Sequence, residues 1–332
     1  MDREQEEIQF LGFFGILKES FNIVSSWRKI FTQITLSLII PLSFIYLAHV
    51  QISEILFTDI MHNEYILDGT PEGTSSYDRI SNMLSSEWTA FLLFKIGYFI
   101  FFSILALLST SAVVYTIACI YTAKEITLKK VMSVVPKVWK RLMFTFMWNF
   151  IIIFAYNIVS LLVLILGIFV LGLIPVLLIV FLVLFLFVYL IGFFYITVIW
   201  HLAAVVSVLE ESYGLNAMAK SQALIKGKMG VCVAVFFVVG LCFVGVQMMF
   251  EILVVLADDG LGKRTGFGVL SLVLMSIVML FGLITQTIIY FVCKSYHHEN
   301  IDKSSLADHL GGYLGEYVPL KSKDVQLEQF EV

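Results

Sequence analysis

The stretch LMFTFMWNFIIIFAYNIVSLLVLILGIFVLGLIPVLLIVFLVLFLFVYLIGFFYITVIWHLAAVVSVL, residues 142–209, contains no Asp, Glu, Lys or Arg over 68 positions. A helix of about 20 apolar residues crosses the hydrocarbon core of a bilayer, so this stretch is long enough for two crossings. Gly167, Gly172 and Pro175 interrupt it near the middle, where such residues favour a turn. We therefore predict two adjacent transmembrane helices at 142–168 and 174–206.

Four further apolar stretches predict transmembrane helices at 30–50, 89–121, 230–256 and 267–293, the first bent at Pro41. The composition agrees, because 60% of the 332 residues are hydrophobic and 14% are charged. Soluble domains have about 45–50% and about 25%. We predict an all-α integral membrane protein with an acidic N-terminal tail (1–9), a six-span membrane domain (10–296) and a C-terminal tail (297–332).

The positive charges predict the orientation in the membrane. Seventeen Lys and Arg residues lie in the N-terminal segment, the second and fourth connections and the C-terminal tail, and three lie in the other connections. Loops rich in Lys and Arg face the cytosol, so both termini should be cytosolic. The acidic loop 51–88 should be lumenal or extracellular. The membrane is expected to belong to the endomembrane system or to be the plasma membrane.

An internal repeat is indicated by three basic segments, each followed by two spans. The segments cover 10–31, 126–142 and 215–229, and apolar residues recur in them at helical spacing. We predict three tandem parallel repeats, each opened by an amphipathic helix in the cytosolic interface. Such helices contact anionic lipid; the alternative is that they are connectors packed under the helix bundle. The residues expected to contact headgroups, here called the basic set, are Arg28, Lys29, Lys129, Lys130, Lys137, Lys140, Arg141, Lys226 and Lys228.

Few polar side chains lie at membrane depth. Lys95 and Glu251 lie near the outer ends of spans two and five, where they could form an intramembrane pair or reach water independently. The uncharged polar residues of the spans are expected to form hydrogen bonds between helices; they are Asn149, Asn157, His201, Gln247 and Gln286.

Motifs for enzymatic chemistry are not found in the sequence. It contains no phosphate-binding Gly-rich loop, no Gly-x-Ser-x-Gly and no Cys-x-x-Cys. The four cysteines lie within or at the ends of apolar runs and are expected to be buried small residues rather than a disulfide framework. We expect no catalytic residue, no cofactor, no metal site and no nucleic-acid partner.

Three segments resemble a plant family of multi-pass membrane proteins: SWRKIFTQIT (26–35), VLEESYGLNAMAKS (208–221) and GYLGEYVPLK (312–321). That family is similar to the membrane domain attached to some bacterial glycerophosphodiester phosphodiesterases. The resemblance implies a stand-alone membrane domain, without the catalytic barrel of the bacterial enzymes.

These observations favour a non-enzymatic membrane protein that organises lipids, through anionic headgroups, or unidentified protein partners at the cytosolic face. One alternative is a transporter or channel for a small or lipid-like solute, with a path near Lys95, Asn157, Gln247 and Glu251. Another is a vesicle cargo receptor or sorting protein, because Tyr317 and Leu320 form a Tyr-x-x-apolar pattern in the tail.

Overall fold

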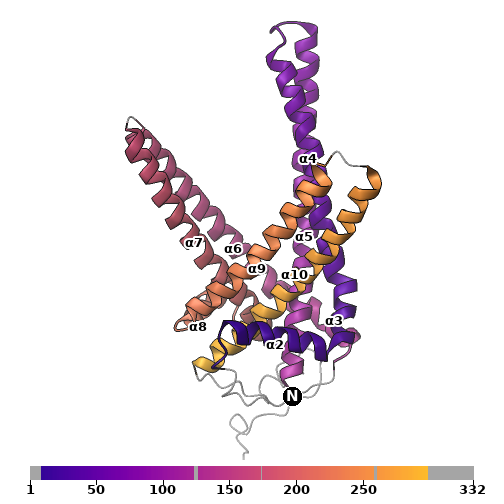
Figure 1. Cartoon of the computed structure of the whole chain (residues 1–332), viewed down its shortest axis with the longest axis vertical. Helices are drawn as coiled ribbons and strands as arrows, with labels where there is room; N and C mark the ends of the chain where they lie inside the picture. Colours follow the sequence, from indigo (N-terminus) through magenta and orange to yellow (C-terminus); the bar gives the residue numbers. More distant parts are fainter. Residues whose placement is uncertain (1–8, 123–125, 173, 258–259, 298–332) are drawn as a thin grey trace, which may run out of the picture. The chain divides into compact units, whose positions relative to one another are not determined.

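The computed structural model describes residues 9–122, 126–172, 174–257 and 260–297, and every regular element in these ranges is a helix. Figure 1 shows the chain. The α-helices and the two π-helices, η1 and η2, follow in the order α2 (Phe13–Ser26), α3 (Arg28–Ile34), η1 (Thr35–Ile39), α4 (Ile40–Asp68), α5 (Ser75–Tyr121), α6 (Leu128–Leu171), α7 (Pro175–Leu209), α8 (Leu215–Ile225), α9 (Met229–Phe250), η2 (Glu251–Val255) and α10 (Leu261–Tyr296).

Six helical stretches of the described residues are long and apolar enough to cross a membrane. They are Arg28–Asp68, Ser75–Tyr121, Leu128–Leu171, Pro175–Leu209, Met229–Val255 and Leu261–Tyr296. The predicted all-α architecture with six apolar helices is therefore confirmed. The helices exceed the predicted spans, because α5 has 47 residues and α6 has 44. At about 1.5 Å per residue, both are roughly twice as long as the hydrocarbon core is thick.

The polar segment 51–88 is helical, whereas the sequence indicated only a loop. α4 continues to Asp68 and α5 begins at Ser75, so the connection outside these helices is a six-residue turn, 69–74. The less exposed residues of α4 recur every three or four positions at Ser53, Leu56, Ile60, Asn63 and Leu67. Those of α5 recur in the same way at Tyr77, Ile80, Leu84, Glu87, Phe91 and Phe94. This spacing is that of a two-helix coiled coil. The polar and charged residues between the seam positions lower the mean hydropathy of the segment, which hid the two helices from the hydropathy pattern.

Two π-helical turns interrupt the regular helices. η1 ends at Ile39, two residues before Pro41, and proline lacks the N–H that would continue the α-helical pattern. The structure thus places an irregular turn next to the bend predicted at Pro41. η2 begins at Glu251, whose carbonyl accepts a hydrogen bond from Leu256 N at 2.9 Å. Arg264 Nε donates to the Val254 carbonyl within η2 at 2.9 Å.

The chain divides into two compact units. Unit 1 consists of Met1–Ile30, Thr110–Ala234 and Ile284–Val332, and unit 2 consists of Phe31–Ser109 and Val235–Leu283. Unit 1 takes residues from all three predicted repeats. The three segments predicted to be amphipathic also differ in form, because the second is continuous with its span as the first part of α6. The repeat itself stays a prediction.

In unit 1, α6 and α7 form an antiparallel pair (Figure 1). The N-terminal half of α6 and the C-terminal half of α7 belong to a buried core with α8 and the end of α10. No residue is buried in the most apolar 18-residue stretch of either helix. Aromatic rings line one side of the upper part of α7, with centroid separations of 5.9, 6.2 and 6.2 Å between Phe181, Phe185, Tyr189 and Phe193 in turn. These rings are half-buried, whereas apolar side chains on the other side of α7, such as Val183 and Phe187, are exposed. Lipid hydrocarbon is the environment that suits such an exposed apolar surface.

Candidate functional site

All nine residues of the basic set belong to unit 1. In the first turns of α6, Lys129, Lys137 and Lys140 are exposed, while Val131, Val134, Val135, Val138 and Leu142 are buried. The buried positions follow the helical period, so the lysines lie on the surface opposite the core. Thr127 caps this end of α6, because its hydroxyl accepts a hydrogen bond from Lys130 N at 3.3 Å.

α2 carries aromatic side chains on its solvent-accessible side. Phe14 is 81% exposed and Phe21 is 66% exposed, and the exposed Lys18 lies between them. The opposite side of α2 is buried and includes Ile16 and Ile23. Its Ser20 hydroxyl lies 3.4 Å from the Thr285 hydroxyl of α10. The helix is therefore held in unit 1 by one side and presents two large apolar rings on the other.

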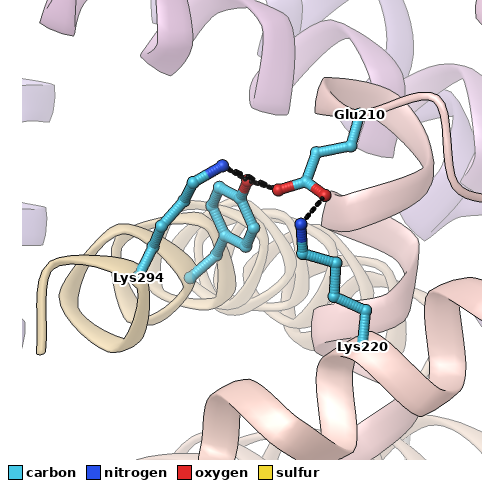
Figure 2. Close-up of polar contacts among 4 residues, drawn as sticks. Glu210, Lys220 and Lys294 are labelled. Atoms are coloured by element: carbon cyan, nitrogen blue, oxygen red, sulfur yellow. Dashed lines mark hydrogen bonds and ion pairs between the residues drawn. The ribbon is translucent and has the colours of Figure 1, made fainter. Parts of the chain in front are cut away.

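A charged cluster joins α7, α8 and α10 (Figure 2). Glu210 Oε2 lies 2.6 Å from Lys220 Nζ of α8. Glu210 Oε1 accepts hydrogen bonds from Lys294 Nζ at 2.7 Å and from the Tyr290 hydroxyl at 2.5 Å, both from α10. The Glu210 side chain is 13% exposed and that of Lys294 is 18% exposed. Donors thus contact both carboxylate oxygens in a largely desolvated place.

The pKa of Glu210 lies below its usual range. Burial alone would raise it, but the hydrogen bonds from Lys220, Lys294 and Tyr290 favour the ionised form and outweigh the burial. A carboxylate stabilised in this way is a weak base. We therefore interpret Glu210 as a structural group that holds α7, α8 and α10 together. Sequence reasoning did not identify this cluster, because Glu210 and Lys294 are far apart in the chain.

The segment between α7 and α8 is tied to α6 beside this cluster. Thr145 Oγ1 accepts a hydrogen bond from Gly214 N at 2.7 Å, and it lies 2.7 Å from the Ser207 hydroxyl. Gly214 has a φ of 62°, which a residue without a Cβ adopts most readily. A Cβ there would also lie 2.9 Å from the Phe144 ring. Ser221 of α8 donates to the Ile199 carbonyl at 2.7 Å.

In unit 2, Lys95 has neutral partners. Its Nζ lies 2.9 Å from His49 Nε2 and 2.9 Å from the Ser53 hydroxyl. It also lies 5.0 Å from the centroid of the Phe91 ring. Within the described part of the chain, no ion pair of 4.0 Å or less joins Lys95 to Glu251. The partners that the structure provides for Lys95 are therefore on α4 and α5.

Four of the five uncharged polar residues of the spans take part in the predicted hydrogen bonds between helices. His201 Nδ1 lies 2.8 Å from Gln286 Oε1. The Tyr46 hydroxyl donates to Gln247 Oε1 at 2.6 Å. The Tyr189 hydroxyl donates to Asn157 Oδ1 at 3.0 Å. Asn157 lies in unit 1, whereas Lys95, Gln247 and Glu251 lie in unit 2, so the proposed solute path draws on residues of both units.

The sorting pattern at Tyr317 and Leu320 lies outside the described residues. Among the residues that the structure describes, no group of three or more His, Cys, Asp and Glu side chains could hold a metal ion.

The model of one protein family, a domain of unknown function designated DUF8558, matches residues 1–330. The chain belongs to the DUF8558 family. No curated protein and no solved structure matches it. The DUF8558 match spans both units, including the basic set, the Glu210 cluster and the polar contacts of Lys95.

Proposed function

We propose that this multi-pass membrane protein is non-enzymatic and organises lipid, or partner proteins, at the cytosolic face of an endomembrane or of the plasma membrane. The observation that carries the proposal is the placement of the basic set in one unit, where lysines of α6 are exposed opposite a buried valine face. Both termini would face the cytosol.

In this proposal α2 lies in the headgroup region of the cytosolic leaflet. Phe14 and Phe21 would enter the boundary between headgroups and acyl chains, as the apolar side of an interfacial helix does. Arg28 and Lys29 begin α3, one residue beyond the end of α2, and are exposed. They would contact the phosphate groups of the same leaflet, as would the first turns of α6.

The test uses full-length protein in nanodiscs that contain phosphatidylserine and phosphatidylcholine. The enrichment of phosphatidylserine around the protein is measured with spin-labelled lipids. In the test variant, Lys129, Lys137, Lys140 and Lys226, all exposed, are each replaced by Glu. Each lysine contributes about 1 kcal/mol of attraction near an anionic surface, so the variant should lose the enrichment by a factor of about ten or more.

The control reverses the charge of Arg79 and Lys263, exposed residues of the connections predicted on the other side of the membrane. The control is measured in asymmetric proteoliposomes, in which only the leaflet next to the basic set contains phosphatidylserine. There the control variant should keep the enrichment. An unchanged enrichment in the test variant would contradict the proposal.

A second candidate, a transporter or channel, is favoured by the contacts of Lys95. Lys95 and His49 are two proton-binding groups that are joined by a hydrogen bond at membrane depth. Ionisable residues at this depth mark ion or proton paths in membranes. The test is proton flux into proteoliposomes that contain a pH-sensitive dye. Flux by the wild-type protein that Lys95→Met abolishes would favour this candidate, and no flux by the wild-type protein would count against it.

A further inference from the structure

Two of the four cysteines are in contact with each other. The Sγ atoms of Cys232 in α9 and Cys293 in α10 are 3.8 Å apart, and both residues are buried. Both belong to unit 1. The sequence predicted buried cysteines, and this is confirmed for Cys119, Cys232 and Cys293, whereas Cys242 is exposed. The pairing could not be predicted, because 61 residues separate the two positions.

The cysteine pair lies close to the polar ends of its two helices. α9 begins at Met229 and α10 ends at Tyr296, so each cysteine is within one turn of a helix end. Just beyond these ends, His297 Nε2 donates to the carbonyls of Leu224 and Lys226 at 3.0 and 2.9 Å. Lys228 Nζ lies 5.2 Å from the centroid of the Tyr296 ring. The two cysteines are therefore buried but lie within one turn of the polar ends of their helices.

We propose that Cys232 and Cys293 form a modification site, a dithiol that a hydroperoxide oxidises to a disulfide. The sulfurs must approach from 3.8 Å to about 2.05 Å, a movement that side-chain rotation in contacting residues can supply. Buried single cysteines are usually inert. What distinguishes this site is that the second thiol is already beside the first and can react with its oxidised form.

The reaction takes place in two steps. The first thiol, as its thiolate, attacks one oxygen of the hydroperoxide; an S–O bond forms, the O–O bond breaks, and the other oxygen leaves with a proton as water or an alcohol. The second thiol then attacks the sulfur of the resulting sulfenic acid. The S–S bond forms, the S–O bond breaks, and the departing hydroxide takes the thiol proton as water. The two sulfurs together lose two electrons, which reduce the hydroperoxide.

The disulfide would join α9 to α10 covalently within unit 1. It would also fix the connection between α8 and α9, which carries Lys226 and Lys228. A covalent tie between two segments separated in sequence raises the stability of the folded state chiefly by restricting the unfolded chain. The proposal does not depend on lipid binding by the basic set.

The test exposes the full-length protein in nanodiscs to hydrogen peroxide at a temperature below its unfolding midpoint. Remaining thiols are then blocked with N-ethylmaleimide, and the digested protein is examined by mass spectrometry. We expect a peptide pair linked through Cys232 and Cys293, which dithiothreitol separates. Cys119→Ser and Cys242→Ser should keep this linked pair, and Cys232→Ser and Cys293→Ser should abolish it.

The linked peptides of the wild-type protein decide the matter even where a serine variant fails to fold. Recovery of Cys232 and Cys293 in fully alkylated form after peroxide treatment would overturn the proposal. So would sulfinic acid at either position without a disulfide, because a second thiol within reach should intercept the sulfenic acid first.

Discussion

Asn63 Nδ2 lies 2.8 and 3.0 Å from the two carboxylate oxygens of Glu87, across the seam between α4 and α5. Both residues occupy seam positions, and the preceding seam positions of the two helices hold the apolar residues Ile60 and Leu84. One polar pair in a coiled-coil seam fixes which residues face each other, at some cost in stability. The pair therefore sets the register of the helical hairpin that replaces the expected loop.

Replacing Asn63 with Leu should loosen this hairpin. The Glu87 carboxylate would lose its donor and face an apolar side chain, which costs about 1–3 kcal/mol. Hydrogen–deuterium exchange of the backbone amides around Ile60 and Leu84 should accelerate accordingly. Asn82→Leu, at an exposed position of α5, is the matched control and should leave the exchange unchanged. Protection equal to that of the wild-type protein in Asn63→Leu would argue against a role for the pair.

Replacing Glu210 with Gln should destabilise unit 1 at neutral pH. The variant leaves Lys220 and Lys294 without their carboxylate, and we expect a loss of about 1–3 kcal/mol, less than for a fully buried pair because Lys220 is 33% exposed. The measurement is thermal unfolding of the protein in nanodiscs. Glu211→Gln removes the same charge from the exposed neighbour and should stay within about 0.5 kcal/mol of the wild type.

The Glu210 cluster also predicts a pH dependence in the acidic range. The pKa of Glu210 is lower in the folded state than the ordinary value of about 4.3. The unfolded chain therefore binds more protons between these two values, and folding stability rises with pH there. The contribution of Glu210 should be complete above about pH 4.3 and should disappear as the pH falls through the folded-state pKa. The stability difference between wild type and Glu210→Gln should shrink in that window; a constant difference would be evidence against it.

Alanine at Gly192 or Gly167 should weaken the pairing of α6 and α7. A Cβ at Gly192 would lie 2.5 Å from the Tyr156 hydroxyl oxygen, which donates to the Tyr189 carbonyl at 2.8 Å. A Cβ at Gly167 would lie 2.1 Å from the Phe181 ring. Overpacking of this kind costs about 1–3 kcal/mol. Unfolding midpoints should fall in both variants, and Gly97→Ala, which meets open space, should be neutral or stabilising by up to about 1 kcal/mol.

Replacing Thr145 with Val should separate hydrogen bonding from packing at the segment between α7 and α8. The valine keeps the shape but removes the acceptor of the buried Gly214 N–H, at a cost of about 1–3 kcal/mol. Thr145→Ser keeps the hydroxyl and should lie closer to the wild type. The two unfolding midpoints provide the comparison, and the interpretation fails if valine is tolerated better than serine.

The amino-acid sequence by itself determined the helical class and the number of apolar helices. The reason is that a bilayer requires about 20 consecutive apolar residues for each crossing, and this requirement is local and visible along the chain. The interhelical hydrogen bonds of His201, Gln247 and Asn157 followed from the same logic, because a polar group among apolar neighbours needs a partner.

Only the tertiary structure decided which distant residues meet. The hairpin of α4 and α5 has a mainly apolar seam, but polar and charged residues outside the seam lower the mean hydropathy of the segment, so hydropathy does not reveal the hairpin. Three contacts join residues that are more than 60 positions apart in the sequence. They are Glu210 with Lys294, Cys232 with Cys293, and Thr145 with Gly214. Their spacing in sequence is arbitrary, because contacts between packed helices depend on crossing geometry and side-chain fit, which a single sequence does not display.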